Sequence, residues 1–118
     1  MSYVQAWARA FALTVFVEEL VAVWLLRGLG VSWPRLAGLV FFAQLASHPA
    51  VWFVFPQLPV GWDAIVAMAE TWAVVSETVF YWLVVPGVGL RRAFGVAALA
   101  NAASFGLGLA LRAVTGWV

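Results

Sequence analysis

Four apolar stretches, each about as long as a lipid bilayer is thick, occupy most of this sequence. They lie near residues 7–29, 34–55, 62–85 and 92–114, and Gly, Pro and Arg residues separate them. Because a hydrocarbon core of about 30 Å requires roughly 20 apolar residues of helix, each stretch is expected to cross a membrane. The short connections join only antiparallel neighbours. We therefore predict an all-α polytopic membrane protein, an antiparallel up-down-up-down four-helix transmembrane bundle, with residues 1–118 as its single domain.

The composition agrees with a lipid environment and excludes several classes of soluble protein. Hydrophobic residues make up 66% of the chain and charged residues 9%, whereas soluble domains are roughly 45–50% apolar and about 25% charged. The chain has no Cys, which excludes disulfides, thiolate metal sites and Cys nucleophiles. Its basic residues are all Arg and form no basic stripe, so we expect no nucleic-acid partner.

The uneven distribution of Arg residues predicts the orientation in the membrane. Four Arg residues flank the first and third connections, whereas two lie on the opposite side of the bundle. The first group consists of Arg27, Arg35, Arg91 and Arg92, and the second of Arg9 and Arg112. Because basic residues are retained on the cytoplasmic side, we expect a multi-pass protein of the inner (plasma) membrane with both termini outside the cytoplasm.

Most Trp residues fall near the predicted ends of the spans, where aromatic side chains line the membrane interfaces. The expected outer group is Trp7, Trp52, Trp62 and Trp117, and the expected inner group is Trp24, Trp33 and Trp82. Trp72 alone lies near mid-depth. We expect it to pack inside the bundle or against a partner.

Four of the five acidic residues lie inside the predicted spans. They are Glu18 and Glu19 in the first span and Glu70 and Glu77 in the third. An ionised acid at mid-bilayer costs roughly 2.5–3.5 kcal/mol, so four unpaired acids would cost on the order of 10 kcal/mol. We therefore expect these acids to be functional, and to be protonated, paired or bound to a cation. Adjacent helical residues point about 100° apart, which leaves open whether Glu18 or Glu19 faces the interior.

Other polar residues lie at similar depths in the second and fourth spans. Gln44 and His48 are four residues apart, and Asn101 and Ser104 are three apart, so each pair shares a helical face. At about 1.5 Å of rise per residue, these groups and the acids occupy a slab roughly 10 Å thick. We expect one buried constellation, which consists of Glu18 or Glu19, Gln44, His48, Glu70, Glu77, Asn101 and Ser104.

Some of these residues also have an ordinary structural explanation. His48 precedes Pro49, which frees a backbone carbonyl in its helix, so the imidazole could serve only to satisfy local groups. Amides and hydroxyls commonly join membrane helices. Gln44, Asn101 and Ser104 could therefore be supporting residues that fix helix packing.

Imidazole and carboxylate groups together suit a divalent cation such as zinc, iron or manganese. The candidate metal ligands are His48, Glu19, Glu70 and Glu77, although the chain contains neither an HExxH nor a Glu-x-x-His pattern. The same groups could carry protons instead. Both kinds of cation stay open.

The pattern of polar residues resembles that of a group of small four-span prokaryotic membrane proteins with no assigned activity. Their second span carries Asn or Gln, then Thr or Ser with His-Pro and a Trp. Their third span has acids two turns apart, and their fourth has Asn-x-x-Ser. The matching stretches here are Gln44 to Trp52, Glu70 to Glu77, and Asn101 to Ser104. The resemblance covers most of the chain and implies that these positions belong together in a prokaryotic membrane protein.

The order Glu18-Glu19, His48, Asn101 is also similar to the site order of the CPBP intramembrane proteases. That resemblance implies a catalytic role for these four residues. The chain departs from the family in having no Arg soon after the Glu pair, Gln44 where the family has Phe, and Ala97 in place of a second His.

Three functions follow from these features. The leading hypothesis is a buried Glu/His/Asn site that binds a cation, a divalent metal or a proton, and supports transport in a homo-oligomer or as a subunit of a larger complex. The first alternative is an intramembrane hydrolase that attacks a lipid or membrane peptide through a metal- or Glu-activated water. The second is a non-catalytic scaffold subunit surrounded by membrane lipids.

Overall fold

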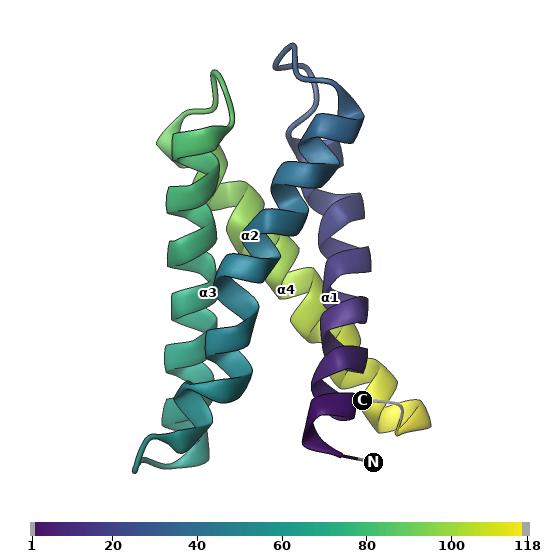
Figure 1. The fold of residues 1–118 in the computed structure, drawn as a ribbon, viewed down its shortest axis with the longest axis vertical. Helices are drawn as coiled ribbons and strands as arrows, with labels where there is room; N and C mark the ends of the chain where they lie inside the picture. The colour runs from purple at the N-terminus through teal and green to yellow at the C-terminus, as the bar shows by residue number, and fades with distance from the viewer. Residues whose placement is uncertain (1, 117–118) are drawn as a thin grey trace.

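The structure is a computed structural model, and it describes residues 2–116. This part of the chain is all-helical. Its elements are α1 (Tyr3–Leu25), α2 (Trp33–Phe53), the short 3-10 helix η1 (Phe55–Gln57), α3 (Trp62–Val84) and α4 (Leu90–Thr115). The four long helices run alternately in opposite directions, so both termini lie at one end of the molecule (Figure 1). The predicted all-helical fold with four helices is therefore confirmed.

Three segments are long and apolar enough to cross a membrane. They are Trp33–Gln57, Trp62–Val84 and Leu90–Thr115. Helix α1 has the same 23-residue length as α3 but is not among them. It carries three charged residues, Arg9, Glu18 and Glu19. Helices α3 and α4 also carry three charged residues each, but they contain 18-residue stretches with two or fewer, whereas every such stretch of α1 includes all three of its charged residues. The first predicted span thus coincides with a helix of sufficient length whose charged residues are spaced too closely for it to be counted among these segments.

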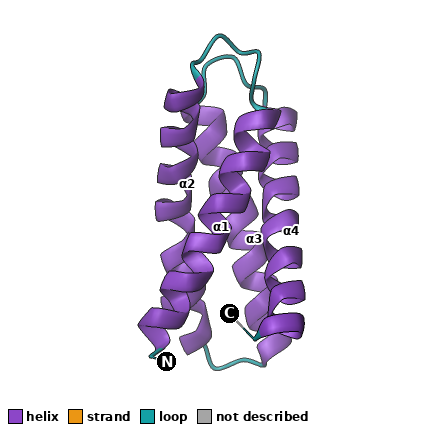
Figure 2. Cartoon of the chain, turned by 90° about the vertical axis from the view of Figure 1, so that its right-hand side faces the viewer, coloured by secondary structure: helices purple, strands orange, loops and turns teal. Residues whose placement is uncertain are grey.

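Local sequence signals explain where the helices begin and how the chain reverses. The Ser2 hydroxyl accepts a hydrogen bond from the Gln5 backbone N–H at 3.1 Å, and the Gln5 side-chain oxygen accepts one from the Ser2 N–H at 2.9 Å. This capping box starts α1. Gly28 and Gly30 have φ of 87° and 78° in the turn that follows α1, a conformation that favours glycine. The connections at both ends of the molecule are short loops (Figure 2).

The helices form a ring in which each packs against two neighbours. Helix α1 contacts α2 and α4, and α3 contacts α2 and α4, whereas within residues 2–116 the diagonal pairs make no comparable contact. The side chains that point to the centre of the ring therefore come from all four helices. The polar residues of the predicted slab lie on these inner faces or close to them.

An apolar core fills the half of the ring nearest the first and third connections. Its members are small and aliphatic side chains together with one Tyr. They are Ala22, Leu26, Leu36, Val40, Ala43, Tyr81, Val85, Val88, Ala93, Val96 and Ala97. Most of these side chains are fully buried, and the cavity described below lies in the other half of the ring.

Arg92, in the first turn of α4, forms hydrogen bonds with the end of α1 and with the turn that follows it. Its Nη2 donates to the carbonyl oxygens of Leu25 and Arg27, both at 2.8 Å, and its Nε donates to Leu25 at 3.2 Å. The guanidinium of Arg27 in turn lies 3.8 Å from the centroid of the Trp24 ring. Arg92 thus satisfies carbonyls that the end of α1 leaves without a helical partner.

Candidate functional site

Glu77 is the centre of a buried polar cluster in the middle of the ring. Its Oε1 accepts a hydrogen bond from Gln44 Nε2 at 2.7 Å, and its Oε2 accepts one from Asn101 Nδ2 at 2.8 Å. All three side chains are buried. The bonds connect α2, α3 and α4. Asn101 Nδ2 also donates to the Ala97 carbonyl at 2.8 Å within its own helix, which orients the amide toward Glu77.

Glu18 completes this cluster from α1. Its side chain is 0% exposed and lies beside Glu77 and Gln44. No N–H or O–H group of the described residues donates to either carboxyl oxygen of Glu18, so a hydrogen bond between Glu18 and Glu77 requires a proton on one of the two acids. A buried polar group without a partner costs about 1–3 kcal/mol, and more when it is charged. The ionised form of Glu18 therefore carries a free-energy cost that no surrounding hydrogen-bond donor offsets.

Tyr81 and Ser47 also belong to the cluster. Ser47 precedes His-Pro in the motif of the second span but was not among the predicted site residues, and Tyr81 was not predicted. Tyr81 is fully buried, and its hydroxyl has no hydrogen-bond partner in the described part of the chain. It lies near Glu18 and Glu77, and Ser47 lies near Glu77. Tyr81 follows Glu77 by four residues and Ser47 follows Gln44 by three, so helical spacing could have identified both.

A cavity of about 460 Å³ fills the half of the ring that carries the termini. All four long helices and η1 contribute to its wall. Its polar and charged lining residues are Tyr3, Thr14, His48, Glu70, Asn101, Ser104 and Arg112, with Trp52 and Trp62 adding indole rings. Asn101 lines the cavity and also donates to Glu77. The inner end of the cavity therefore adjoins the Glu18–Glu77 cluster.

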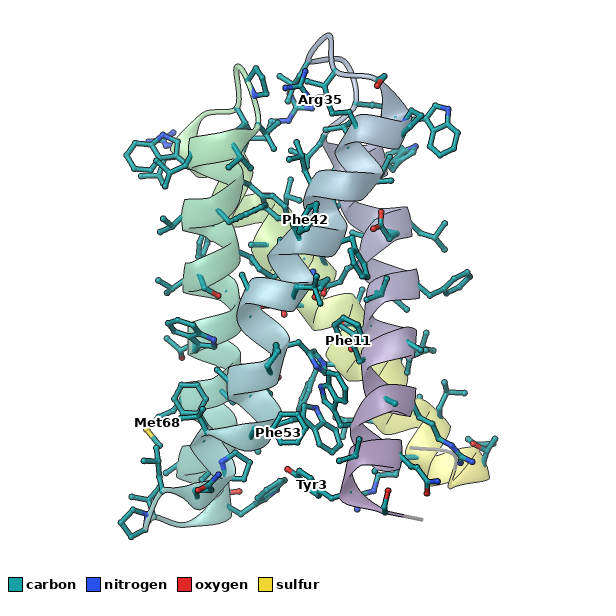
Figure 3. The ribbon with its side chains drawn as sticks, viewed as in Figure 1. Tyr3, Phe11, Arg35, Phe42, Phe53 and Met68 are labelled. Atoms are coloured by element: carbon teal, nitrogen blue, oxygen red, sulfur yellow. The ribbon has the colours of Figure 1, made fainter. Side chains whose placement is uncertain are left out.

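His48 is held by aromatic residues. Its Nδ1 accepts a hydrogen bond from Trp7 Nε1 at 3.1 Å, and its ring lies 5.2 Å from the Phe11 ring centroid. Because Nδ1 is the acceptor, the neutral imidazole carries its hydrogen on Nε2. Phe11, Phe53 and Tyr3 point into the same space between α1 and α2 (Figure 3). Within residues 2–116 His48 makes no ion pair with a carboxylate, so its surroundings differ from the predicted pairing with acids.

Glu70 and Glu19 lie apart from the central cluster. Glu70 is half-buried on the cavity wall and makes no hydrogen bond or ion pair within residues 2–116. Glu19 lies at a shallow hollow on the outer surface between α1 and α2, beside Phe16 and Phe41, and its Oε2 has no partner among the described residues. Of the two adjacent acids, Glu18 thus lies fully inside the ring, whereas Glu19 is half-buried at the outer hollow, with its Oε2 atom buried.

The predicted metal ligands do not lie together in the structure, and neither do the predicted catalytic residues. Residues 2–116 contain no group of three or more His, Asp or Glu side chains that could hold a metal ion. Of the four candidate metal ligands, Glu77 is in the cluster, His48 and Glu70 line the cavity, and Glu19 is on the outer surface. Among the proposed catalytic residues, Glu18 and Asn101 both adjoin Glu77, whereas His48 and Glu19 do not.

Ser104 and Trp72 occupy supporting positions. Ser104 Oγ donates to the Asn101 carbonyl at 3.2 Å, and the side chain lines the cavity wall. Trp72 is 39% exposed, and its Nε1 donates to the Ser47 carbonyl at 3.1 Å. This bond joins α3 to α2 from the outside of the ring. Trp117, assigned to the outer interface from the sequence, lies outside the described residues.

No protein-family model, no curated protein and no solved structure matches the chain.

Proposed function

We propose that the chain is an integral membrane protein whose four helices form an antiparallel transmembrane bundle, and that the buried pair Glu18–Glu77 binds a proton in support of cation transport. One observation carries this proposal. Glu18 is fully buried beside a second carboxyl group, and no described residue donates a hydrogen bond to either of its oxygens. A proton on Glu18 removes the charge that this site could not otherwise accommodate.

The outer surface of the helices supports placement in a membrane. Large apolar side chains are exposed on every helix, among them Trp24, Trp33, Trp62 and Leu83. On a soluble monomer such surfaces would be unusually extensive. Helix α1 would cross with the other three because it packs against α2 and α4 and directs Glu18 to the interior. In that position the fully buried carboxyl group of Glu18 does not contact lipid.

The hydrogen bonds of Glu77 explain why the proton would reside on Glu18. Glu77 accepts one N–H from Gln44 and another from Asn101, an arrangement that stabilises a carboxylate. Glu18 has no such donors. A pair that shares one proton would therefore hold its negative charge on Glu77. Divalent metals require more ligands than these two groups, so the donor set favours a proton over zinc, iron or manganese.

The cavity supports access to this pair from one side of the membrane only. It extends from the end that carries the termini to Asn101, next to Glu77. The apolar core closes the opposite half. A complete transport path would require these helices to rearrange, or a second copy or partner subunit to supply the remaining part. Both options agree with a homo-oligomer or a larger membrane complex.

The decisive experiment is infrared difference spectroscopy on the full chain in lipid, combined with proton flux measured in proteoliposomes with an internal pH dye. We expect a carbonyl band of a protonated carboxyl group that shifts in D2O and disappears in Glu18→Gln, together with loss of flux. Glu19→Gln is the matched control and should keep both signals. A band unaffected by Glu18→Gln, or a stoichiometric divalent metal in the purified protein, would overturn the proposal.

The hydrolase alternative has less support. It requires an opening to lipid that reaches the catalytic acid, and the hollow at Glu19 contains neither His48 nor Asn101. A lipid or peptide bound at Glu19 would therefore lie away from the other groups assigned to catalysis.

A further inference from the structure

The cavity in the terminal half of the bundle has features that proton binding at Glu18 and Glu77 does not use. We propose that it is a binding site for a monovalent organic cation with an aromatic or apolar body, and that Glu70 is the counter-ion. The proposal concerns residues other than the carboxyl pair, so it can fail or succeed independently of the proposed function.

The size and wall of the cavity suit a small organic molecule. Its volume of about 460 Å³ lies within the range of roughly 300–1,000 Å³ that is typical of ligand pockets. Most of the wall is apolar, with side chains such as Leu13, Val51 and Ile65. Aromatic side chains from all four helices add π faces, which attract cations. These aromatic residues are Tyr3, Trp52, Trp62 and Phe105.

Glu70 is the only acidic residue among the described residues that line the cavity. It is half-buried and makes no hydrogen bond or ion pair within residues 2–116, so its carboxyl group is free to contact a ligand. His48 is neutral when its Nδ1 accepts from Trp7, and it therefore adds no competing charge. A small metal ion would need several oxygen ligands. One carboxylate in an aromatic and apolar wall suits a large, weakly hydrated cation better.

Arg112 lies at the mouth of the cavity and does not neutralise Glu70. Arg112 is an exposed residue three positions before the end of α4, whereas Glu70 is eight positions from the start of α3. At about 1.5 Å per residue, Glu70 lies roughly 7–8 Å deeper than Arg112. A cation that passes Arg112 would therefore meet Glu70 deeper in the cavity. Arg112 can extend away into water.

Isothermal titration calorimetry on the detergent-solubilised full chain tests the proposal with two probes of similar shape. Benzyltrimethylammonium joins a phenyl ring to a quaternary cation, and phenylmethanesulfonate joins the same ring to an anion. We expect saturable one-site binding of the cation and none of the anion. Glu70→Gln should weaken cation binding by about tenfold or more, the effect of losing one close charge partner. Glu19→Gln, which alters an acid outside the cavity, should bind the cation as the wild type does.

Equal binding of the cation by Glu70→Gln, equal binding of the two probes, or no saturable binding of the cation would each overturn the proposal. Trp62→Ala keeps the test valid if Glu70→Gln does not fold. Trp62 is 67% exposed and contributes no buried contact to the core, so this variant should fold and should weaken cation binding severalfold. Unchanged affinity in Trp62→Ala would contradict an aromatic cation site. The infrared signal of Glu18 reports separately on the proton-binding pair.

Discussion

Glu18 and Glu77 lie side by side in the interior of the helix ring, but only Glu77 has hydrogen-bond donors. Two acids of the same type, at the same depth, thus occupy opposite local environments. Glu77 is part of a satisfied network, whereas Glu18 is a fully buried group whose oxygens have no partner in the described chain. The hydrogen bonds of Glu77 can stabilise the fold, whereas the buried position of Glu18 is better explained by a function.

Replacement of the two acids by Leu should have opposite effects on stability. At a pH high enough to remove the proton that the pair shares, Glu18→Leu removes a buried carboxylate that lies beside a second carboxylate and has no donor, and it should raise the free energy of unfolding by about 1–3 kcal/mol. Glu77→Leu leaves the Gln44 amide without its acceptor and removes one of the two acceptors of the Asn101 amide, which keeps only the Ala97 carbonyl, and it should lower the free energy of unfolding by about 2–4 kcal/mol. Thermal or denaturant unfolding in matched micelles gives both values. Destabilisation by Glu18→Leu of the same size would show that Glu18 has hydrogen-bond partners.

A finer comparison at position 77 distinguishes hydrogen bonding from charge. Glu77→Gln keeps one carbonyl oxygen as an acceptor but places an NH2 group against the second amide donor, so one of the two bonds is lost. We expect a stability loss of about 1–2 kcal/mol, smaller than that of Glu77→Ala, which loses both bonds. The same unfolding assay ranks the variants. Equal losses for Gln and Ala would mean that the charge, rather than the number of bonds, determines the contribution of Glu77.

The interior and exterior acids of α1 illustrate what the sequence could and could not predict. The four helices, and the three of them that are long and apolar enough to cross a membrane, were predictable because length and apolar content are local properties. The rotation of α1 about its axis depends on packing against α2 and α4, so the sequence left open which of Glu18 and Glu19 faces inward. The structure assigns Glu18 to the interior and Glu19 to the hollow on the outer surface.

The predicted metal ligands show a related limit. Equal depth on two adjacent helices does not bring two side chains together when each side chain turns toward a different neighbour. His48 and Glu70 were expected at the same depth, yet His48 bonds with Trp7 and Glu70 stands alone on the cavity wall. By contrast, the grouping of Gln44, Glu77 and Asn101 followed from their inward helical faces. The cavity was not predictable, because it depends on how α1–α4 diverge toward the termini.

Trp7 should determine which nitrogen of His48 carries hydrogen. The Trp7 Nε1–H occupies His48 Nδ1, which requires the Nε2–H tautomer in the neutral ring. Trp7→Phe keeps an aromatic ring but removes this donor. In 15N-labelled protein we expect a single Nε2–H tautomer in the wild type and a mixture in the variant. Trp52→Phe, which alters a neighbouring ring that forms no hydrogen bond with His48, should keep the wild-type tautomer.

Arg92 should control the stability of the end that is closed by the apolar core. Its guanidinium donates three hydrogen bonds to the carbonyls of Leu25 and Arg27, which connects α4 to the turn after α1. Arg92→Gln should lose most of these bonds and lower the free energy of unfolding by about 1–2 kcal/mol, a moderate value because the group is exposed. Amide hydrogen exchange in residues 25–31 should accelerate in Arg92→Gln more than in Arg91→Gln, the matched control next to it. Equal exchange in the two variants would mean that the connection is held by the apolar core alone and that Arg92 contributes only charge at the membrane surface.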